Sequence, residues 1–108
     1  MKTIEDYQNK GFSSAELNEI KLGLDKGLNV DIYADSSFNE RQMEQIRLGL
    51  ESNVEVELYA DPFYNADQME QIRLGLEEGI DVEGYLDYAL DAMEMEEIRL
   101  GLEDSYYF

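Results

Sequence analysis

The feature that most constrains this chain is the pentapeptide I-[KR]-L-G-L, which recurs at a spacing of 26 residues. Its four copies begin at Ile20, Ile46, Ile72 and Ile98. A fixed period of this length is typical of proteins that stack one small structural unit many times, because a single unit cannot bury its apolar face alone. The repeat therefore predicts a stacked array.

Alignment on the pentapeptide divides the chain into repeat units. Three are full units, residues 12–37, 38–63 and 64–89, and residues 90–108 form a C-terminal partial unit. Residues 1–11 match the second half of a unit, since Ile4 and Tyr7 stand where Val and Tyr stand in later copies. We expect residues 1–108 to form a single repeat domain, because 108 residues suffice for one modest core.

Each unit has the signals of a longer helix at its start. A short polar residue followed three positions later by Glu or Gln predicts a capping box, in which each side chain bonds the other residue's backbone amide. The four pairs are Ser13/Glu16, Asn39/Gln42, Asn65/Gln68 and Asp91/Glu94. Apolar residues before the cap and at its fourth helical position add a hydrophobic staple. The residues expected to end the helix in a left-handed conformation are Gly27, Asn53 and Gly79.

A second, shorter helix is predicted in the second half of each unit. Its expected starts are near Thr3, Asn29, Glu55 and Asp81. The predicted fold class is therefore all-α, a short α-solenoid of tandem 26-residue helix–turn–short-helix units. On the longer helix, Met43, Ile46 and Leu50 share one apolar face. Leu48 points nearly opposite, and we expect the adjacent Gly49 to admit the backbone of another segment.

Several conspicuous residues have structural interpretations. Tyr7 and its repeat equivalents are predicted to be core residues whose hydroxyls reach water. Surface pairing with an acid four residues later explains the basic row better than phosphate binding does; this row is Lys21, Arg47, Arg73 and Arg99. Tyr106 and Phe108 are predicted to seal the last unit, with contact to a partner as the alternative.

Charge is the compositional outlier, with 26 acidic residues against 8 basic ones and a formal net charge of −18. Residues 1–48 contain 9 acids and 6 bases, a net charge of −3, whereas residues 49–108 contain 17 acids and 2 bases, a net charge of −15. A chain this acidic is repelled by nucleic acids and anionic lipids and attracted to basic surfaces. We therefore expect no direct nucleic-acid or membrane contact.

The sequence argues against catalysis and cofactors. Histidine and cysteine are absent, which excludes imidazole catalysis, disulfides and the usual zinc ligands. No phosphate-binding glycine motif appears, and the acidic turns lack the order of an EF-hand loop. We expect no enzyme activity, no metal and no cofactor, with a calcium-responsive module as a minor alternative. The lack of cysteine, of a secretion signal and of a long apolar run predicts a cytoplasmic protein.

Stacking would turn equivalent acidic positions into rows with members about 10 Å apart, the usual distance between packed helices. The residues predicted to bind a partner are Glu44, Glu57, Asp61, Glu70, Glu77, Glu83, Asp87, Glu96 and Glu103. Such rows would present a field like that of a nucleic-acid backbone to a basic groove. The alternative is an α-solenoid adaptor for other proteins, in which acidity serves solubility; it would use Tyr33, Tyr59 and Tyr85 on its concave face if these residues are exposed.

The units, such as Y-A-D-P-F-Y-N-A-D-Q-M-E-Q-I-R-L-G-L-E-E-G-I-D-V, resemble short helical repeats in proteins of gut-bacterial mobile elements and phages. In size and acidity the chain is also similar to anti-CRISPR proteins, many of which mimic DNA. This resemblance is one of type and carries no residue roles. It implies an inhibitor in the cytoplasm of a bacterial host cell, whose partner is a basic nucleic-acid-binding protein such as a CRISPR effector nuclease. The sequence leaves a homodimer open.

Overall fold

The computed structural model describes residues 2–106, with side chains described for residues 2–104. These residues form helices and contain no strand, as the sequence predicts. The longer helices are α1 (Ser14–Asp25), α2 (Glu40–Glu51), α3 (Ala66–Glu77) and α4 (Ala92–Tyr106). Four short 3-10 helices alternate with them: η1 (Ile4–Asp6), η2 (Val30–Ile32), η3 (Val56–Leu58) and η4 (Val82–Tyr85).

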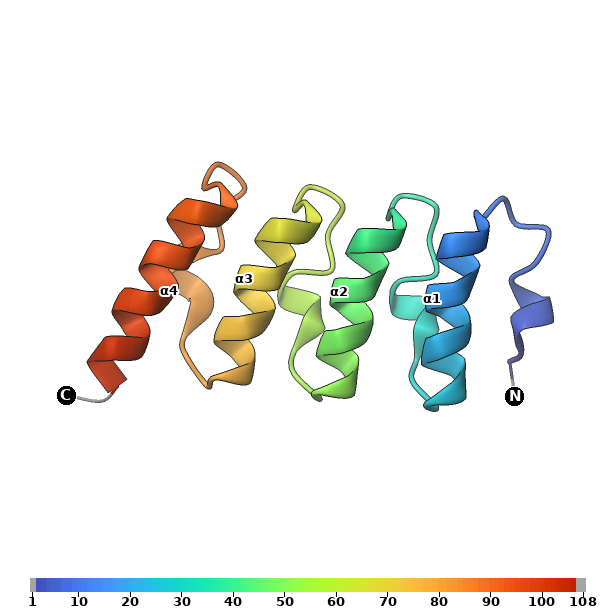
Figure 1. The fold of residues 1–108 in the computed structure, drawn as a ribbon, viewed down its shortest axis with the longest axis horizontal. Helices are drawn as coiled ribbons and strands as arrows, with labels where there is room; N and C mark the ends of the chain where they lie inside the picture. Colours follow the sequence, from blue (N-terminus) through green and yellow to red (C-terminus); the bar gives the residue numbers. More distant parts are fainter. Residues whose placement is uncertain (1, 107–108) are drawn as a thin grey trace.

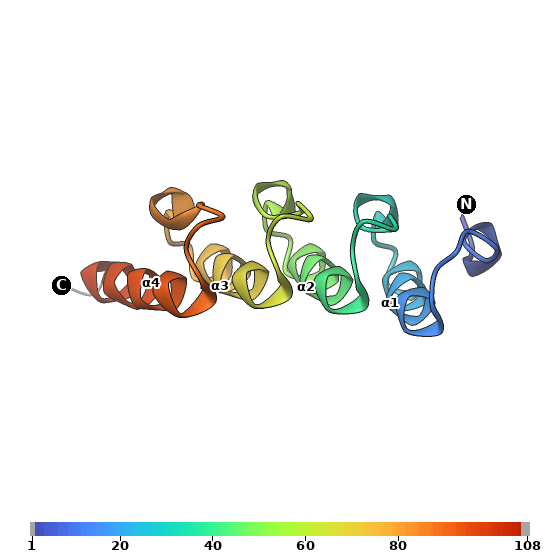
Figure 2. The same ribbon diagram turned by 90° about the horizontal axis from the view of Figure 1, so that it is seen from above.

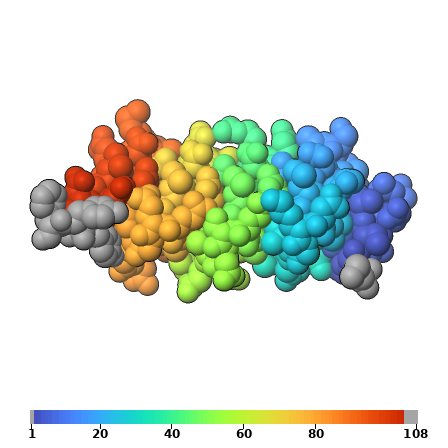
Figure 3. Space-filling view, turned by 60° about the horizontal axis from the view of Figure 1, so that its bottom comes forward, coloured from blue at the N-terminus to red at the C-terminus, as the bar shows by residue number. Residues whose placement is uncertain are grey.

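The four α-helices lie side by side in chain order, each packed against the next (Figure 1). The 3-10 helices form a second row along one side of them (Figure 2). The resulting body measures 50 × 25 × 17 Å, and its successive segments follow one another along the long axis (Figure 3). Equivalent positions in the repeat therefore recur along the length of the molecule.

The predicted helix boundaries are confirmed. The side chains of Ser13, Asn39 and Asn65 each accept a hydrogen bond from the backbone amide three residues later, and the reciprocal bonds are also present. Asp91 and Glu94 make the same pair of bonds before α4. The three predicted left-handed residues have positive φ, 70° at Gly27, 58° at Asn53 and 75° at Gly79.

The core runs between the two rows of helices. Met43, Ile46, Met69 and Ile72 face inward from α2 and α3 and are fully buried. Val56 meets them from η3, as Val30 and Val82 do from the neighbouring short helices. In this way each α-helix covers its neighbours and a short helix at the same time.

The helix glycines serve a contact that differs from the expectation. The atoms nearest to the position that a Cβ of Gly49 would take belong to side chains rather than backbone: the Tyr59 hydroxyl lies there and donates to the Gln45 carbonyl at 2.7 Å. The same bond joins Tyr33 to Glu19 at 2.6 Å and Tyr85 to Gln71 at 2.9 Å. The tyrosine hydroxyls are therefore bound to the helix backbone rather than to water. A side chain at the glycine would leave them no room, which explains why the repeat retains a poor helix former.

Two glutamines join successive units. Gln68 accepts from the Asn65 amide as part of the cap, and its Nε2 donates to the carbonyls of Tyr88 and Leu90 at 3.2 and 2.7 Å. Gln42 makes the equivalent bonds to Pro62 and Tyr64. An amide can both accept from the cap and donate to the next unit, whereas an ionised carboxylate can only accept. Glutamate at this position can accept from the cap but cannot donate to the two carbonyls of the next unit. We call this pair of donated bonds the glutamine clamp.

This difference gives a prediction for stability. Gln68→Glu should lower the free energy of unfolding by about 1–3 kcal/mol, because it removes a buried donor and places a carboxylate against two carbonyls. Urea denaturation measures the change. The converse substitution, Glu16→Gln, keeps the cap of α1 and supplies a donor toward Ser36 and Phe38, the equivalent carbonyl positions, so it should stabilise by about 1 kcal/mol. Equal effects of the two substitutions would show that the clamp contributes nothing.

Candidate functional site: the acidic surface

The basic side chains of the longer helices form ion pairs with neighbouring acids. The expected pairs four residues apart are confirmed: Lys21–Asp25 at 3.0 Å, Arg73–Glu77 at 2.9 Å, Arg99–Glu103 at 3.6 Å, and a close Arg47–Glu51 contact. Arg73 and Arg99 are the only basic residues of the sequence beyond residue 48. Since both are paired, little positive charge remains to offset the acids around them.

The three arginines also reach the preceding helix, which the sequence did not reveal. Nε of Arg73 donates to Gln45 at 2.9 Å and Nε of Arg99 to Gln71 at 3.0 Å, while Arg47 meets Glu19 at 2.7 Å. Arg99 is accordingly only 8% exposed. The sequence feature that could have predicted these contacts is the Glu or Gln that lies 28 residues before each arginine. These side chains hold the array together and are not surface pairs alone.

Five of the nine predicted partner-binding acids have structural roles. Glu70 and Glu77 pair with Arg73, and Glu103 pairs with Arg99. Asp61 and Asp87 each accept a hydrogen bond from the backbone amide two residues later, at 2.9 and 2.8 Å. Their charges still contribute to the surface field, but their replacement would also disturb the fold.

The other four acids are free to meet a partner. Glu44, Glu57, Glu83 and Glu96 are exposed, and none of their carboxylates has a hydrogen bond or ion pair within the described part of the chain. Their carboxylates therefore make no contact that the fold depends on. The structure thus separates four accessible carboxylates from the five that stabilise the fold.

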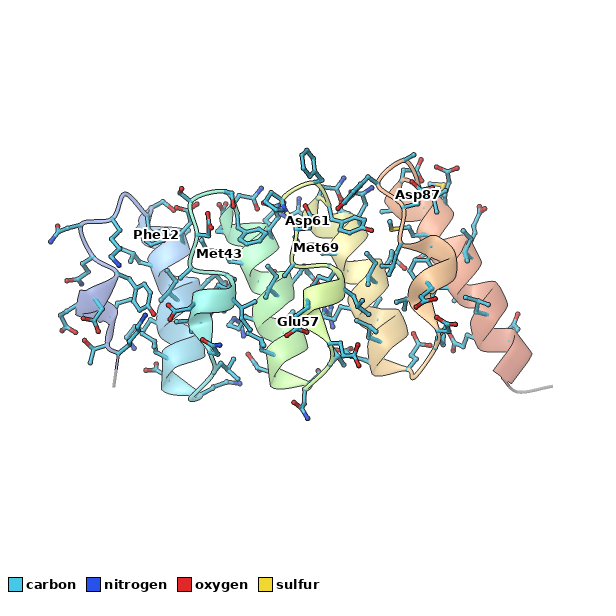
Figure 4. The ribbon with its side chains drawn as sticks, turned by 180° about the vertical axis from the view of Figure 1, so that it is seen from behind. Phe12, Met43, Glu57, Asp61, Met69 and Asp87 are labelled. Atoms are coloured by element: carbon cyan, nitrogen blue, oxygen red, sulfur yellow. The ribbon has the colours of Figure 1, made fainter. Side chains whose placement is uncertain are left out.

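These four glutamates lie on two faces. Glu57 and Glu83 are on the short helices, and Figure 4 shows Glu57 on η3. Glu44 is on α2, five residues before Gly49, so it lies about 140° around the helix from the glycine that faces η3. Glu96 is its equivalent on α4. We call Glu44 and Glu96 the α-row, and Glu57 and Glu83 the η-row.

Local contacts shift the pKa of some acids in opposite directions. A hydrogen bond from Lys26 lowers the pKa of Glu51. At the C-terminal end, a hydrogen bond with the Glu78 carboxyl raises the pKa of Glu103, and the like charge of Glu78 adds to the effect. The acidic surface is therefore crowded enough at this end for two carboxyls to interact directly.

Tyr33, Tyr59 and Tyr85 are fully buried, so the exposure that their role in the adaptor alternative requires is not met. Tyr106 and Phe108 lie outside the residues whose side chains are described. Across residues 2–106, no group of three potential ligands is arranged to hold a metal ion. Within the same range, every helix is too short or too polar to cross a bilayer.

No protein-family model, curated protein or solved structure matches the chain.

Proposed function

We propose that this protein is a non-enzymatic inhibitor, an acidic α-solenoid that occupies the nucleic-acid groove of a basic nucleic-acid-binding protein. A CRISPR effector nuclease is the class of partner to test first. The observation that supports the proposal is the set of four exposed, unpaired glutamates, Glu44, Glu57, Glu83 and Glu96, on a body whose net charge is −18.

The fixed positions of its carboxylates distinguish this surface from one whose acids serve only solubility. The carboxylates stand on helices fixed by caps, glutamine clamps and arginine pairs, so binding would cost little conformational entropy compared with a flexible acidic tail. Self-repulsion at −18 opposes folding, and ordinary solubility needs a net charge of only about 2–8 in a small domain. A repeat that maintains such charge in fixed rows is suited to a groove built for phosphates.

The test compares the two rows. In one variant, Glu44→Gln and Glu96→Gln neutralise the α-row; in the other, Glu57→Gln and Glu83→Gln neutralise the η-row. Guide-loaded CRISPR nucleases are assayed for DNA binding and cleavage with each protein over a range of salt concentrations. We expect the native protein to compete with DNA for the nuclease. Neutralisation of the row that faces the groove should lower the affinity of the protein for the nuclease on the order of tenfold and remove part of the salt dependence of binding.

The choice of glutamates keeps folding and binding apart. None of the four substitutions removes a described contact, so thermal unfolding should be unchanged or slightly improved by the lower self-repulsion. If both variants inhibit as well as the native protein with the same salt dependence, mimicry is wrong. Salt-insensitive binding to a partner that does not bind nucleic acid would instead support the adaptor.

A further inference from the structure

An exposed pair of aromatic rings lies in the loops that precede α3 and α4. Phe63 is 79% exposed and Tyr88 is 52% exposed. Their ring centroids are 5.6 Å apart and the rings are tilted by 58°. Tyr88 also packs at 4.6 Å on Tyr64, which is buried beneath it. We call Phe63 and Tyr88 the aromatic edge.

The repeat does not require the aromatic edge. Ser37 and Ala89 occupy the position of Phe63 in the neighbouring units, and Ser36 and Pro62 occupy that of Tyr88. Those units keep the same loop and the same cap with small side chains. Since Phe63 contributes little to the core, the fold alone gives no reason for a phenylalanine at this place.

Carboxylates flank the aromatic edge. Asp61 accepts a close hydrogen bond from the Tyr88 hydroxyl and another from the Phe63 amide. Burial raises the pKa of Tyr64, which lies between the two loops, and the charges of Asp61 and Asp87 raise it further. Figure 4 shows Asp61 and Asp87 along the same edge of the molecule. The patch thus offers an open ring beside negative charge.

This combination suits one side chain better than others. A guanidinium can stack flat on an aromatic ring while its N–H groups point to carboxylates, whereas the ammonium of lysine is compact and strongly hydrated. An apolar partner would have to bury the adjacent carboxylates unpaired, which is costly. We propose that the aromatic edge binds an arginine of the basic partner, stacked on Phe63 and paired with Asp61 or Asp87. The inference rests on the proposed function and adds one specific contact between the inhibitor and its partner.

The test uses two peptides of equal charge, octa-arginine and octa-lysine, as probes of the intact protein. Affinities are measured by calorimetry at fixed salt for the native protein, for Phe63→Ala and for Met93→Ala. Met93 is a matched control because it is also strongly exposed, at 70%, but lies on α4. We expect the native protein to prefer octa-arginine by about threefold, the size expected of an exposed cation–π contact.

Phe63→Ala should abolish that preference without changing the affinity for octa-lysine, and Met93→Ala should leave the preference intact. A native protein that binds both peptides equally, or a preference that survives Phe63→Ala, would overturn the inference. The two row variants separate this outcome from the proposed function. If they leave nuclease inhibition untouched while Phe63→Ala still removes the arginine preference, then the inhibitor proposal fails and the arginine site stands.

Discussion

Replacement of Gly49 by alanine should destabilise the protein by about 3 kcal/mol, even though alanine is the better helix former. The new Cβ would overlap the Tyr59 hydroxyl and lie 2.7 Å from Cγ1 of Val56. Overpacking of this kind costs about 1–3 kcal/mol, and displacement of the hydroxyl from the Gln45 carbonyl strands a buried donor at a further 1–3 kcal/mol or so. The gain in helix propensity, about 1 kcal/mol, is too small to compensate. Denaturant unfolding at neutral pH measures the balance.

Gly101→Ala is the matched control. Gly101 is in the fourth copy of the same pentapeptide, but among the described residues no tyrosine or valine side chain lies within 4 Å of the position that its Cβ would take. Here only helix propensity changes, so the substitution should stabilise by about 1 kcal/mol. Adding Tyr59→Phe to Gly49→Ala removes the overlapping oxygen and should recover part of the loss. Equal losses at both glycines would show that the tyrosine contact is not the reason for the repeat's glycine.

The contrast between caps and glycines shows what the sequence could predict. Helix starts at Ser13 and Asn39 were predictable because a capping box involves residues only three positions apart. The turn at Asn53 was predictable because a left-handed residue after a helix has a narrow choice of side chain. The partner of Gly49 was not, because Tyr59 reaches it across a turn and a second helix. The regular spacing of glycine and tyrosine was visible, but its geometry was not.

The acidic surface also has features that the sequence predicts and features that only the structure shows. Its charge and its C-terminal bias follow from counting residues. Counting does not show which carboxylates are unpaired, because that depends on how far each arginine side chain extends. Arg73 and Arg99 reach the preceding helix and also pair with acids on their own helix. Reversal of Glu70 or Glu77 would therefore mix loss of binding with loss of an ion pair. Glu44 and Glu96 carry no such ambiguity.

Alkaline pH should unfold this protein steeply. Burial raises the pKa of Tyr85 to about 12 and also raises the pKa of Tyr33 and Tyr59. These phenols stay protonated in the folded chain when an unfolded chain has begun to ionise near pH 10. The folded state then binds more protons, so stability that is intact below pH 10 falls as the pH rises. Three phenols together should give a slope of about 4 kcal/mol per pH unit.

Tyr59→Phe isolates one of the three phenols from the other titrating groups, including the lysines. At pH 7 the variant should be less stable by about 1 kcal/mol, the net value of one hydrogen bond, because the Gln45 carbonyl keeps the Gly49 amide as its helical donor. Above pH 10 its stability should fall less steeply, by about 1.4 kcal/mol per pH unit. The two stability curves should therefore cross near pH 11, where the variant becomes the more stable protein. Guanidinium unfolding at pH 7, 10 and 11 locates the crossing, and parallel curves would mean that the Tyr59 hydroxyl ionises in the folded protein as easily as in water.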